Sequence, residues 1–135
     1  MKRVAIITSS DMGYQGKRED LSGPAIKKIA EREGYQVVSM DILPDDRDML
    51  AAEMARIADE GIAELLLTTG GTGFSPRDCM PEATMDISER MVPGIPEAIR
   101  RNSPAMWSLA CSTSSRRSRH VSVTAASNCR NCAFG

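Results

Sequence analysis

The stretch from Leu65 to Thr84 constrains the fold more than any other part of the chain. It begins with three consecutive leucines, which are typical of a strand buried on both faces in a parallel sheet covered by helices. Residues 68–73, TTGGTG, follow, and glycines there permit positive φ angles and leave several backbone N–H groups available to an anion. Arg77 and Asp78 then supply a cation for phosphate and an acid for a metal ion or a proton. This order predicts a ligand site beyond the carboxyl ends of an open α/β sheet, with an ordinary glycine turn as the alternative.

Strands and helices are predicted to alternate along residues 3–101. The apolar runs are rich in aliphatic and β-branched residues, and the segments between them repeat apolar residues at helical spacing. Ser22 is the predicted N-cap of the first helix, and Gly34 and Gly61 are predicted to end two helices. The sequence therefore predicts an α/β fold with right-handed crossovers between parallel strands. The predicted elements are strands at Arg3–Ser9, Tyr35–Leu43 and Ile62–Leu67, helices from Ser22 to Gly34 and at Asp48–Glu60, Pro81–Arg90 and Pro96–Arg101, and a ligand-ordered loop over residues 10–21.

Composition narrows the classes of function. A length of 135 residues is typical of one domain, and a net charge of −1 gives no global attraction to nucleic acid or to an anionic membrane. No run of about 18 apolar residues occurs, so no membrane span is predicted. The apolar run after Lys2 and Arg3 ends before Asp11 and is too short for a secretory signal. We therefore expect a cytoplasmic protein whose four cysteines are reduced.

The charge changes abruptly towards the C-terminus. All 18 acidic residues lie at or before Glu97, and beyond it the charged side chains other than His120 are six arginines. Residues 108–135 hold seven serines, four arginines and three cysteines but no acid. Only residues 120–126 keep an alternating pattern compatible with a short strand. The rest of this tail shows no helical or strand period, and we expect no regular structure there.

The tail holds candidate residues for two functions. Four zinc ligands are available in principle, but their spacing matches no known zinc motif, so chance thiols are the favoured interpretation. An arginine cluster lies in the same segment, but no aromatic residues accompany it, and no nucleic-acid partner is predicted. The four candidate zinc ligands are Cys111, His120, Cys129 and Cys132, and the cluster is Arg116, Arg117 and Arg119.

Polar side chains follow each predicted strand of the first hundred residues. Ser9, Ser10 and Asp11 end the first strand, Asp45 follows the second, and the glycine-rich run follows the third. Because parallel strands end at one edge of the sheet, these groups are predicted to converge. Hydroxyls, amides and acids together suit a phosphorylated ligand held with Mg²⁺, which prefers one or two carboxylates plus phosphate oxygens. Taken singly, Asp11 and Asp45 are better explained by helix capping or loop solvation, and it is their shared edge of the sheet that favours a function.

Four stretches closely resemble those of the MogA/MoaB family of molybdenum cofactor biosynthesis proteins, to which the G domain of gephyrin and its plant counterpart also belong. They are Asp20-Leu-Ser-Gly-Pro24, Pro44-Asp45-Asp46 and, most specifically, TTGGTGFSPRDCMPEAT with Arg90-Met-Val-Pro-Gly94. The resemblance runs from Val4 to Asn102, about three quarters of the chain. It implies a doubly wound, three-layer α/β/α fold with a mostly parallel central sheet, and a homotrimer or another homo-oligomer.

The resemblance also implies a reaction and a set of site residues. Family members transfer AMP from Mg-ATP to molybdopterin, which gives adenylyl-molybdopterin and pyrophosphate. By motif position, Asp45 and Asp78 are the expected catalytic acids and Mg²⁺ ligands. The alternative is a non-catalytic MoaB-type module that binds molybdopterin or a nucleotide. The other expected contacts to substrate are Ser10, Asp11, Asp20, Gly70, Gly71, Thr72, Gly73, Ser75 and Glu82.

The resemblance ends where the composition changes. Family members continue with a helix, an apolar strand, an Asn-Leu/Met-Pro-Gly loop and a last helix, and no such sequence follows here. Our hypothesis is a shift of the coding frame near Asn102 to Trp107. It divides the chain into a family domain at residues 1–107, whose C-terminal part is missing, and a foreign tail at residues 108–135.

Overall fold

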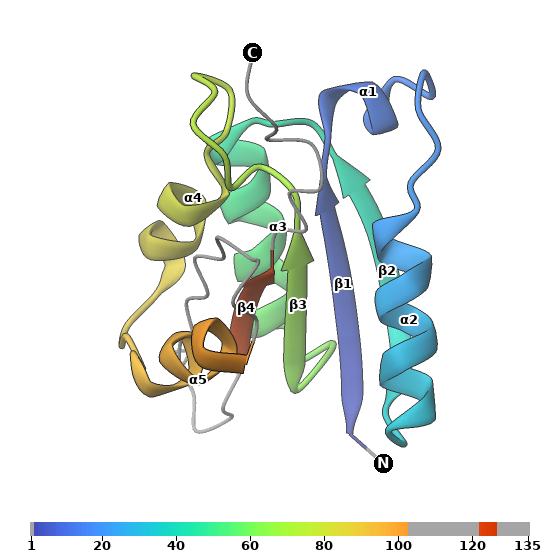
Figure 1. Cartoon of the computed structure of the whole chain (residues 1–135), viewed down its shortest axis with the longest axis vertical. Coiled ribbons are helices and arrows are strands. Elements are labelled where there is room, and N and C mark those ends of the chain that lie inside the picture. Colours follow the sequence, from blue (N-terminus) through green and yellow to red (C-terminus); the bar gives the residue numbers. More distant parts are fainter. Residues whose placement is uncertain (1, 103–121, 127–135) are drawn as a thin grey trace.

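Four parallel strands form one sheet in the order β2-β1-β3-β4 (Figure 1). The computed structural model describes residues 2–102 and 122–126 of the chain. Strands and helices alternate as the sequence predicts, and the α/β fold class is confirmed. The strands are β1 (Arg3–Ser9), β2 (Gln36–Leu43), β3 (Leu65–Thr69) and β4 (Ser122–Ala126), and the helices are α1 (Asp11–Tyr14), α2 (Ser22–Arg32), α3 (Arg47–Asp59), α4 (Met80–Ile87) and α5 (Gly94–Asn102).

Strand β1 lies at the centre of the sheet because it pairs with two neighbours. Its partners in β2 run from Gln36 to Leu43, and its partners in β3 run from Leu65 to Thr69. Six of its seven residues are buried, as expected for an apolar run covered on both faces. The connection after β1 leads to β2 on one side, whereas the connection after β3 leads to β4 on the other. The strand order therefore reverses between β1 and β3, which is where open α/β sheets bind their ligands.

Helices cover both faces of the sheet. Helix α2 packs on β1 and β2, where Pro24 shares a pocket with Ile6 and Thr8. Helices α3 and α4 pack on the opposite face and on each other. These three layers are the predicted α/β/α arrangement. The main core lies on the α3 and α4 face and consists of Ala5, Ile7, Leu50, Met54, Ile57, Ala63, Leu66, Met80 and Ala83.

The segment between β1 and α2 differs from the predicted loop. It contains one helical turn, α1. The Ser10 hydroxyl caps this turn by accepting the Gly13 N–H at 3.0 Å. The predicted N-cap Ser22 is also wrong, because α2 already begins at Ser22 and Leu21 occupies the N-cap position. The Asp20 carboxylate accepts the N–H groups of Ser22 at 3.0 Å and Gly23 at 3.1 Å instead. An acid two residues further upstream therefore caps α2.

The short strand allowed by residues 120–126 is confirmed as β4, over Ser122–Ala126. It pairs in parallel with β3, from Leu65 opposite Ser122 to Thr69 opposite Ala126. The other residues of the predicted tail, including Cys111, Cys129 and Cys132, lie outside the described residues. The domain boundary at residue 107 stays a prediction. Within residues 2–102 and 122–126, no helix has the length and apolar character needed to cross a membrane.

Candidate functional site

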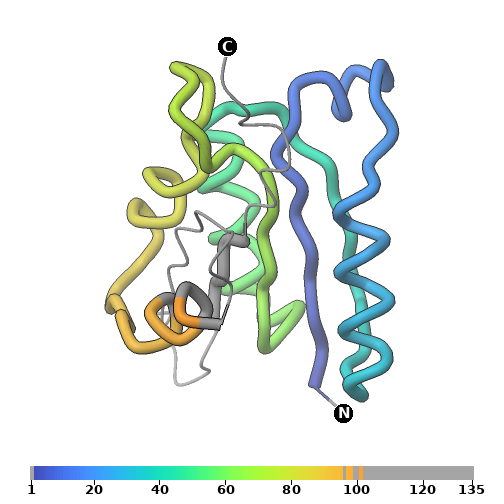
Figure 2. Tube along the Cα trace, in the orientation of Figure 1, coloured from blue at the N-terminus to red at the C-terminus, as the bar shows by residue number. Residues whose placement is uncertain are grey.

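The loops after β1, β2 and β3 meet at the carboxyl end of the sheet (Figure 2). Contact is closest between Gly70, directly after β3, and Ser9, the last residue of β1. A Cβ atom added to Gly70 would lie 2.2 Å from the backbone oxygen of Ser9. One added to Gly71 would lie 2.9 Å from the Ser9 Oγ and 3.2 Å from Asp45 Oδ1. Glycine is therefore needed here because the loop backbone touches the ends of β1 and β2.

Asp45 is held by three hydrogen bonds across this end of the sheet. The Ser9 hydroxyl donates to Asp45 Oδ1, and the Asp11 N–H donates to Asp45 Oδ2 at 3.1 Å. In return, the Asp45 N–H donates to Asp11 Oδ1 at 2.9 Å. The sequence shows only that Asp11 and Asp45 follow neighbouring strands. In the structure, the backbone N–H of each donates to the carboxylate of the other. Ser9 is 4% exposed, so the hydroxyl that bonds to Asp45 is buried in the protein.

Arg77 connects the glycine loop to this pair of acids. Its guanidinium donates to both carboxylate oxygens of Asp11, from Nε to Oδ2 at 3.0 Å and from Nη2 to Oδ1 at 2.9 Å. The Arg77 side chain is 62% exposed and that of Asp11 is 31% exposed. The hydrogen bonds from Arg77, and then the Asp45 N–H, lower the pKa of Asp11 below its ordinary value. The carboxylate is therefore ionised at neutral pH, and the pKa of Arg77 is raised in turn.

The carboxylate of Asp78 contacts the same loop. Its carboxylate accepts the N–H of Ser75 at 3.0 Å, and its own N–H donates to the Ser75 oxygen at 2.9 Å. A Cβ added to Gly73 would lie 2.7 Å from Asp78 Oδ2. The Met80 N–H donates to the Gly71 oxygen at 3.0 Å, which ties the base of the loop to the start of α4. Asp45 and Asp78 consequently border the loop at Gly71 and Gly73.

Backbone amides of this loop are available to an anion. Within the described part of the chain, the N–H groups of Gly71, Thr72 and Gly73 donate to no acceptor, and these residues are half-buried or exposed. The start of α4 is less suitable. The Met80 N–H is already bonded to Gly71, Pro81 has none, and the Ala83 N–H donates to Cys79. An anion at this carboxyl end of the sheet, called the rim below, would therefore bind the loop rather than the helix terminus.

The donor set suits a cation that arrives with a phosphorylated ligand. Among the described residues, no three His, Cys, Asp or Glu side chains are grouped closely enough to hold a metal ion. Of the three carboxylates described above at this end of the sheet, Asp11 is paired with Arg77, which leaves Asp45 and Asp78. Two carboxylates are the number that Mg²⁺ commonly takes from a protein, with phosphate oxygens and water completing its coordination. Asp45 and Asp78 therefore fit Mg²⁺ brought by a ligand, and they do not form a preorganised metal cage.

The structure separates the predicted site residues into groups. Asp11, Asp45, Gly70 and Gly71 are brought together, and Gly73, Ser75 and Asp78 form the adjoining turn. Glu82 is exposed in the first turn of α4. Ser10 caps α1. Sequence reasoning placed Ser9 and Arg77 near the rim without recognising that they hold Asp45 and Asp11, because those contacts join residues 36 and 66 positions apart.

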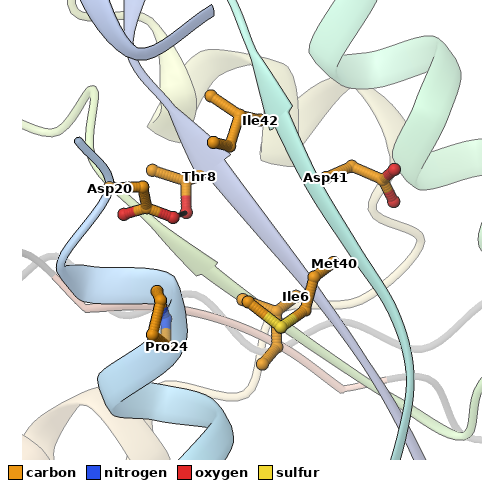
Figure 3. A pocket seen from close by; sticks show the side chains of 7 residues that line it. All are labelled: Ile6, Thr8, Asp20, Pro24, Met40, Asp41 and Ile42. Carbon is orange, nitrogen blue, oxygen red and sulfur yellow. Dashed lines mark hydrogen bonds between the residues drawn. The ribbon is translucent and has the colours of Figure 1, made fainter. Parts of the chain in front are cut away.

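Asp20 occupies a different position from the other predicted site residues. Its carboxylate accepts the Thr8 hydroxyl at 2.9 Å in addition to the two N–H groups of α2. Figure 3 shows it beside Thr8 and Pro24, in a pocket of about 270 Å³ on the α2 face of the sheet. A Cβ at Gly23 would lie 2.4 Å from Asp20 Oδ2, which explains the glycine of the Asp-Leu-Ser-Gly-Pro motif.

Cys79, directly after Asp78, is not built as a nucleophile. It packs against the core, and burial raises the pKa of its thiol, with Asp45 and Glu82 adding to the effect. The thiolate is therefore scarce at neutral pH. Cys79 is therefore a packing residue.

Comparison with known proteins places the chain in a family. The sequence profile of the family described as "Probable molybdopterin binding domain" matches residues 5–127, which extends beyond the predicted boundary at residue 107. Molybdopterin adenylyltransferase of Helicobacter pylori J99 is 34% identical over 102 residues, covering 74% of this chain and 58% of that protein. The enzyme of the same name from Escherichia coli K12 is 29% identical over 101 residues, covering 73% and 52%. The chain thus spans little more than half the length of these relatives.

Solved structures show the same fold. MoaB from Thermus thermophilus, described as a molybdopterin biosynthesis enzyme, superposes with a TM-score of 0.80 at 31% identity, covering 94% of this chain and 81% of that chain. The profile match over most of the chain and the shared architecture show that this chain belongs to the molybdopterin-binding domain family that includes the MogA and MoaB proteins.

Proposed function

We propose that this protein acts in molybdenum cofactor biosynthesis by transferring AMP from Mg-ATP to molybdopterin. The observation that carries the proposal is the loop after β3, in which three N–H groups without an acceptor among the described residues lie between Asp45 and Asp78. Amides that receive phosphate and acids that hold a divalent cation are the parts that phosphoryl-transfer chemistry needs. The two relatives named molybdopterin adenylyltransferase support molybdopterin as the acceptor of an adenylyl group.

In this proposal each group at the rim has one task. The amides of Gly71, Thr72 and Gly73 bind phosphate oxygens of the nucleotide. Asp45 and Asp78 are the groups that would hold Mg²⁺, which neutralises phosphate charge when it is bound. The terminal phosphate of molybdopterin forms a bond to the α-phosphorus of ATP, and the bond from that phosphorus to pyrophosphate breaks. Ser9 and Asp11 position Asp45. Ser10 and Asp20, which cap α1 and α2, are also proposed from motif position to line the substrate site.

Two further parts of the proposal come from motif position and from the family. Ser75 and Glu82 are proposed to contact substrate at the border of the loop. The protein is proposed to form a homotrimer or another homo-oligomer, which light scattering on the purified chain would test. Half-exposed apolar side chains on the edge strand β2 (Val38, Met40 and Ile42) are compatible with such contacts.

Replacing Asp78 with Asn tests the catalytic part of the proposal. The variant keeps the shape of the side chain and an oxygen for the Ser75 N–H, but it removes the charge proposed to hold Mg²⁺. We expect pyrophosphate release from ATP in the presence of molybdopterin to fall by about 100-fold or more, while molybdopterin binding changes little. Wild-type protein that binds molybdopterin but releases no pyrophosphate would instead identify the MoaB-type binding module.

A further inference from the structure

Arg77 follows the glycine loop, and its guanidinium binds the carboxylate of Asp11. Both nitrogens of the fork are used, at 3.0 and 2.9 Å from the two oxygens of one carboxylate. A guanidinium binds two phosphate oxygens with the same planar fork. The Asp11 carboxylate therefore occupies the position, relative to Arg77, that a phosphate group would take.

The two partners differ in how firmly they are held. Asp11 begins α1, and both its N–H and its Oδ1 are bonded to Asp45, so its place does not depend on Arg77. Arg77 lies on the outer part of the loop, where Phe74 is 99% exposed, and its side chain is 62% exposed. An ion pair exposed to this degree is weak and exchanges readily. Arg77 is consequently the partner that can leave.

A ligand bound to the loop would lie within reach of this arginine. Gly71, which carries one of the available N–H groups, touches Asp45, and Asp45 is bonded directly to Asp11. A phosphate on the loop amides is therefore next to the acid that holds Arg77. We propose that Asp11 is a placeholder for ligand phosphate, which holds Arg77 in the free protein and releases it to a polyphosphate oxygen on binding. The inference rests on the proposed function only in requiring that the loop binds phosphate.

Calorimetric titration with inorganic pyrophosphate, at low salt and with EDTA to exclude divalent cations, tests this exchange. Asp11→Asn keeps an oxygen for the Asp45 N–H but removes the charge that competes for Arg77, so binding should tighten about two- to five-fold. Arg77→Met should weaken binding about ten-fold. In the double variant, Asp11→Asn should no longer raise pyrophosphate affinity, because the Arg77 guanidinium for which pyrophosphate and Asp11 compete is gone.

Glu64→Gln is the matched control. Glu64 also forms a forked ion pair with an arginine, Arg3, but at the opposite end of β1. The substitution changes the net charge by the same amount, and it should leave pyrophosphate affinity unchanged because salt screens a charge at that distance. If Asp11→Asn does not fold, Asp11→Ser removes the same charge with a smaller side chain. It then replaces Asp11→Asn in the single and double variants.

Three results would overturn the inference. They are unchanged or weaker pyrophosphate binding in a folded Asp11→Asn protein, a gain that persists in the Arg77→Met background, and the absence of binding in both the wild type and Asp11→Asn. The transferase proposal fails separately, since it depends on molybdopterin-dependent turnover. Turnover without the Asp11→Asn gain would reject only the placeholder, and the gain without turnover would reject only the transferase.

Discussion

Glycines with positive φ angles in this protein differ in what surrounds them. Gly34 and Gly70 have nearly equal φ angles of 84° and 83°. A side chain at Gly34 would meet no atom within 4 Å, whereas one at Gly70 would lie 2.2 Å from the backbone oxygen of Ser9. At Gly34, glycine is needed only for the positive φ angle. At Gly70, it is also needed because β1 and the loop after β3 approach each other closely.

This pair of glycines gives a prediction at the residue scale. Gly34→Ala should lower the free energy of unfolding by about 1 kcal/mol, the cost of a left-handed residue with a side chain. Gly70→Ala should cost about 3 kcal/mol, because the backbone it meets cannot rotate aside. Urea denaturation of both variants measures the difference. Equal losses would show that the contact between Gly70 and Ser9 is not tight.

The ion pair at the other end of the sheet predicts a pH dependence. The side chain and then the backbone N–H of Arg3 hydrogen-bond to Glu64 and lower its pKa from 4.5 to about 2. A carboxyl whose pKa is lower in the folded state stabilises the fold above its unfolded pKa, and the contribution is lost as the pH falls towards the folded pKa. Wild type should therefore be more stable than Glu64→Gln at pH 7, and the difference should shrink between about pH 4.5 and pH 2. Denaturation at a series of pH values measures it, and a difference independent of pH would contradict the assignment.

At the scale of elements, the ends of α2 and α3 explain why β2 and β3 do not begin at Tyr35 and Ile62 as predicted. Each helix closes with the same pair of hydrogen bonds at a glycine, from Gly34 to Glu31 and Tyr35 to Ala30 in α2. In α3 the Ile62 N–H bonds to Ile57. This motif uses the residue after the glycine to close the helix. Tyr35 and Ile62 are apolar enough to be predicted as strand, but their N–H groups already belong to the preceding helix.

The cap of α2 gives a prediction at the same scale. Asp20→Ala removes the acceptor for two helix N–H groups and for the Thr8 hydroxyl, and it should cost about 1–2 kcal/mol of unfolding free energy. Ser22→Ala is the matched control, because the Ser22 side chain makes no capping bond, and it should change stability by less than about 0.5 kcal/mol. Thermal unfolding of the two variants would distinguish them. A larger loss in Ser22→Ala would restore the serine as the cap.

At the scale of the whole molecule, the alternation of elements was enough to predict the fold class and the edge where polar groups gather. Asp11, Asp45 and the glycine loop could be placed together because parallel strands end at one edge. Their individual bonds could not be predicted, since Ser9 meets Asp45, and Arg77 meets Asp11, only after the sheet is assembled. The motif did not reveal that the Asp20 carboxylate also caps α2, and its proposed contact with substrate stays a prediction. The partner of β3 was equally hidden, since Ser122–Ala126 follows a segment without periodicity.

The most direct test of the central claim is transfer of labelled AMP from α-phosphate-labelled ATP to molybdopterin by the purified 135-residue chain. Our account predicts a labelled pterin product, formed together with pyrophosphate, that requires Mg²⁺ and is lost in the Asp78→Asn protein. Folded wild-type protein that binds molybdopterin and ATP but forms no labelled product would contradict the transferase assignment and leave a binding module.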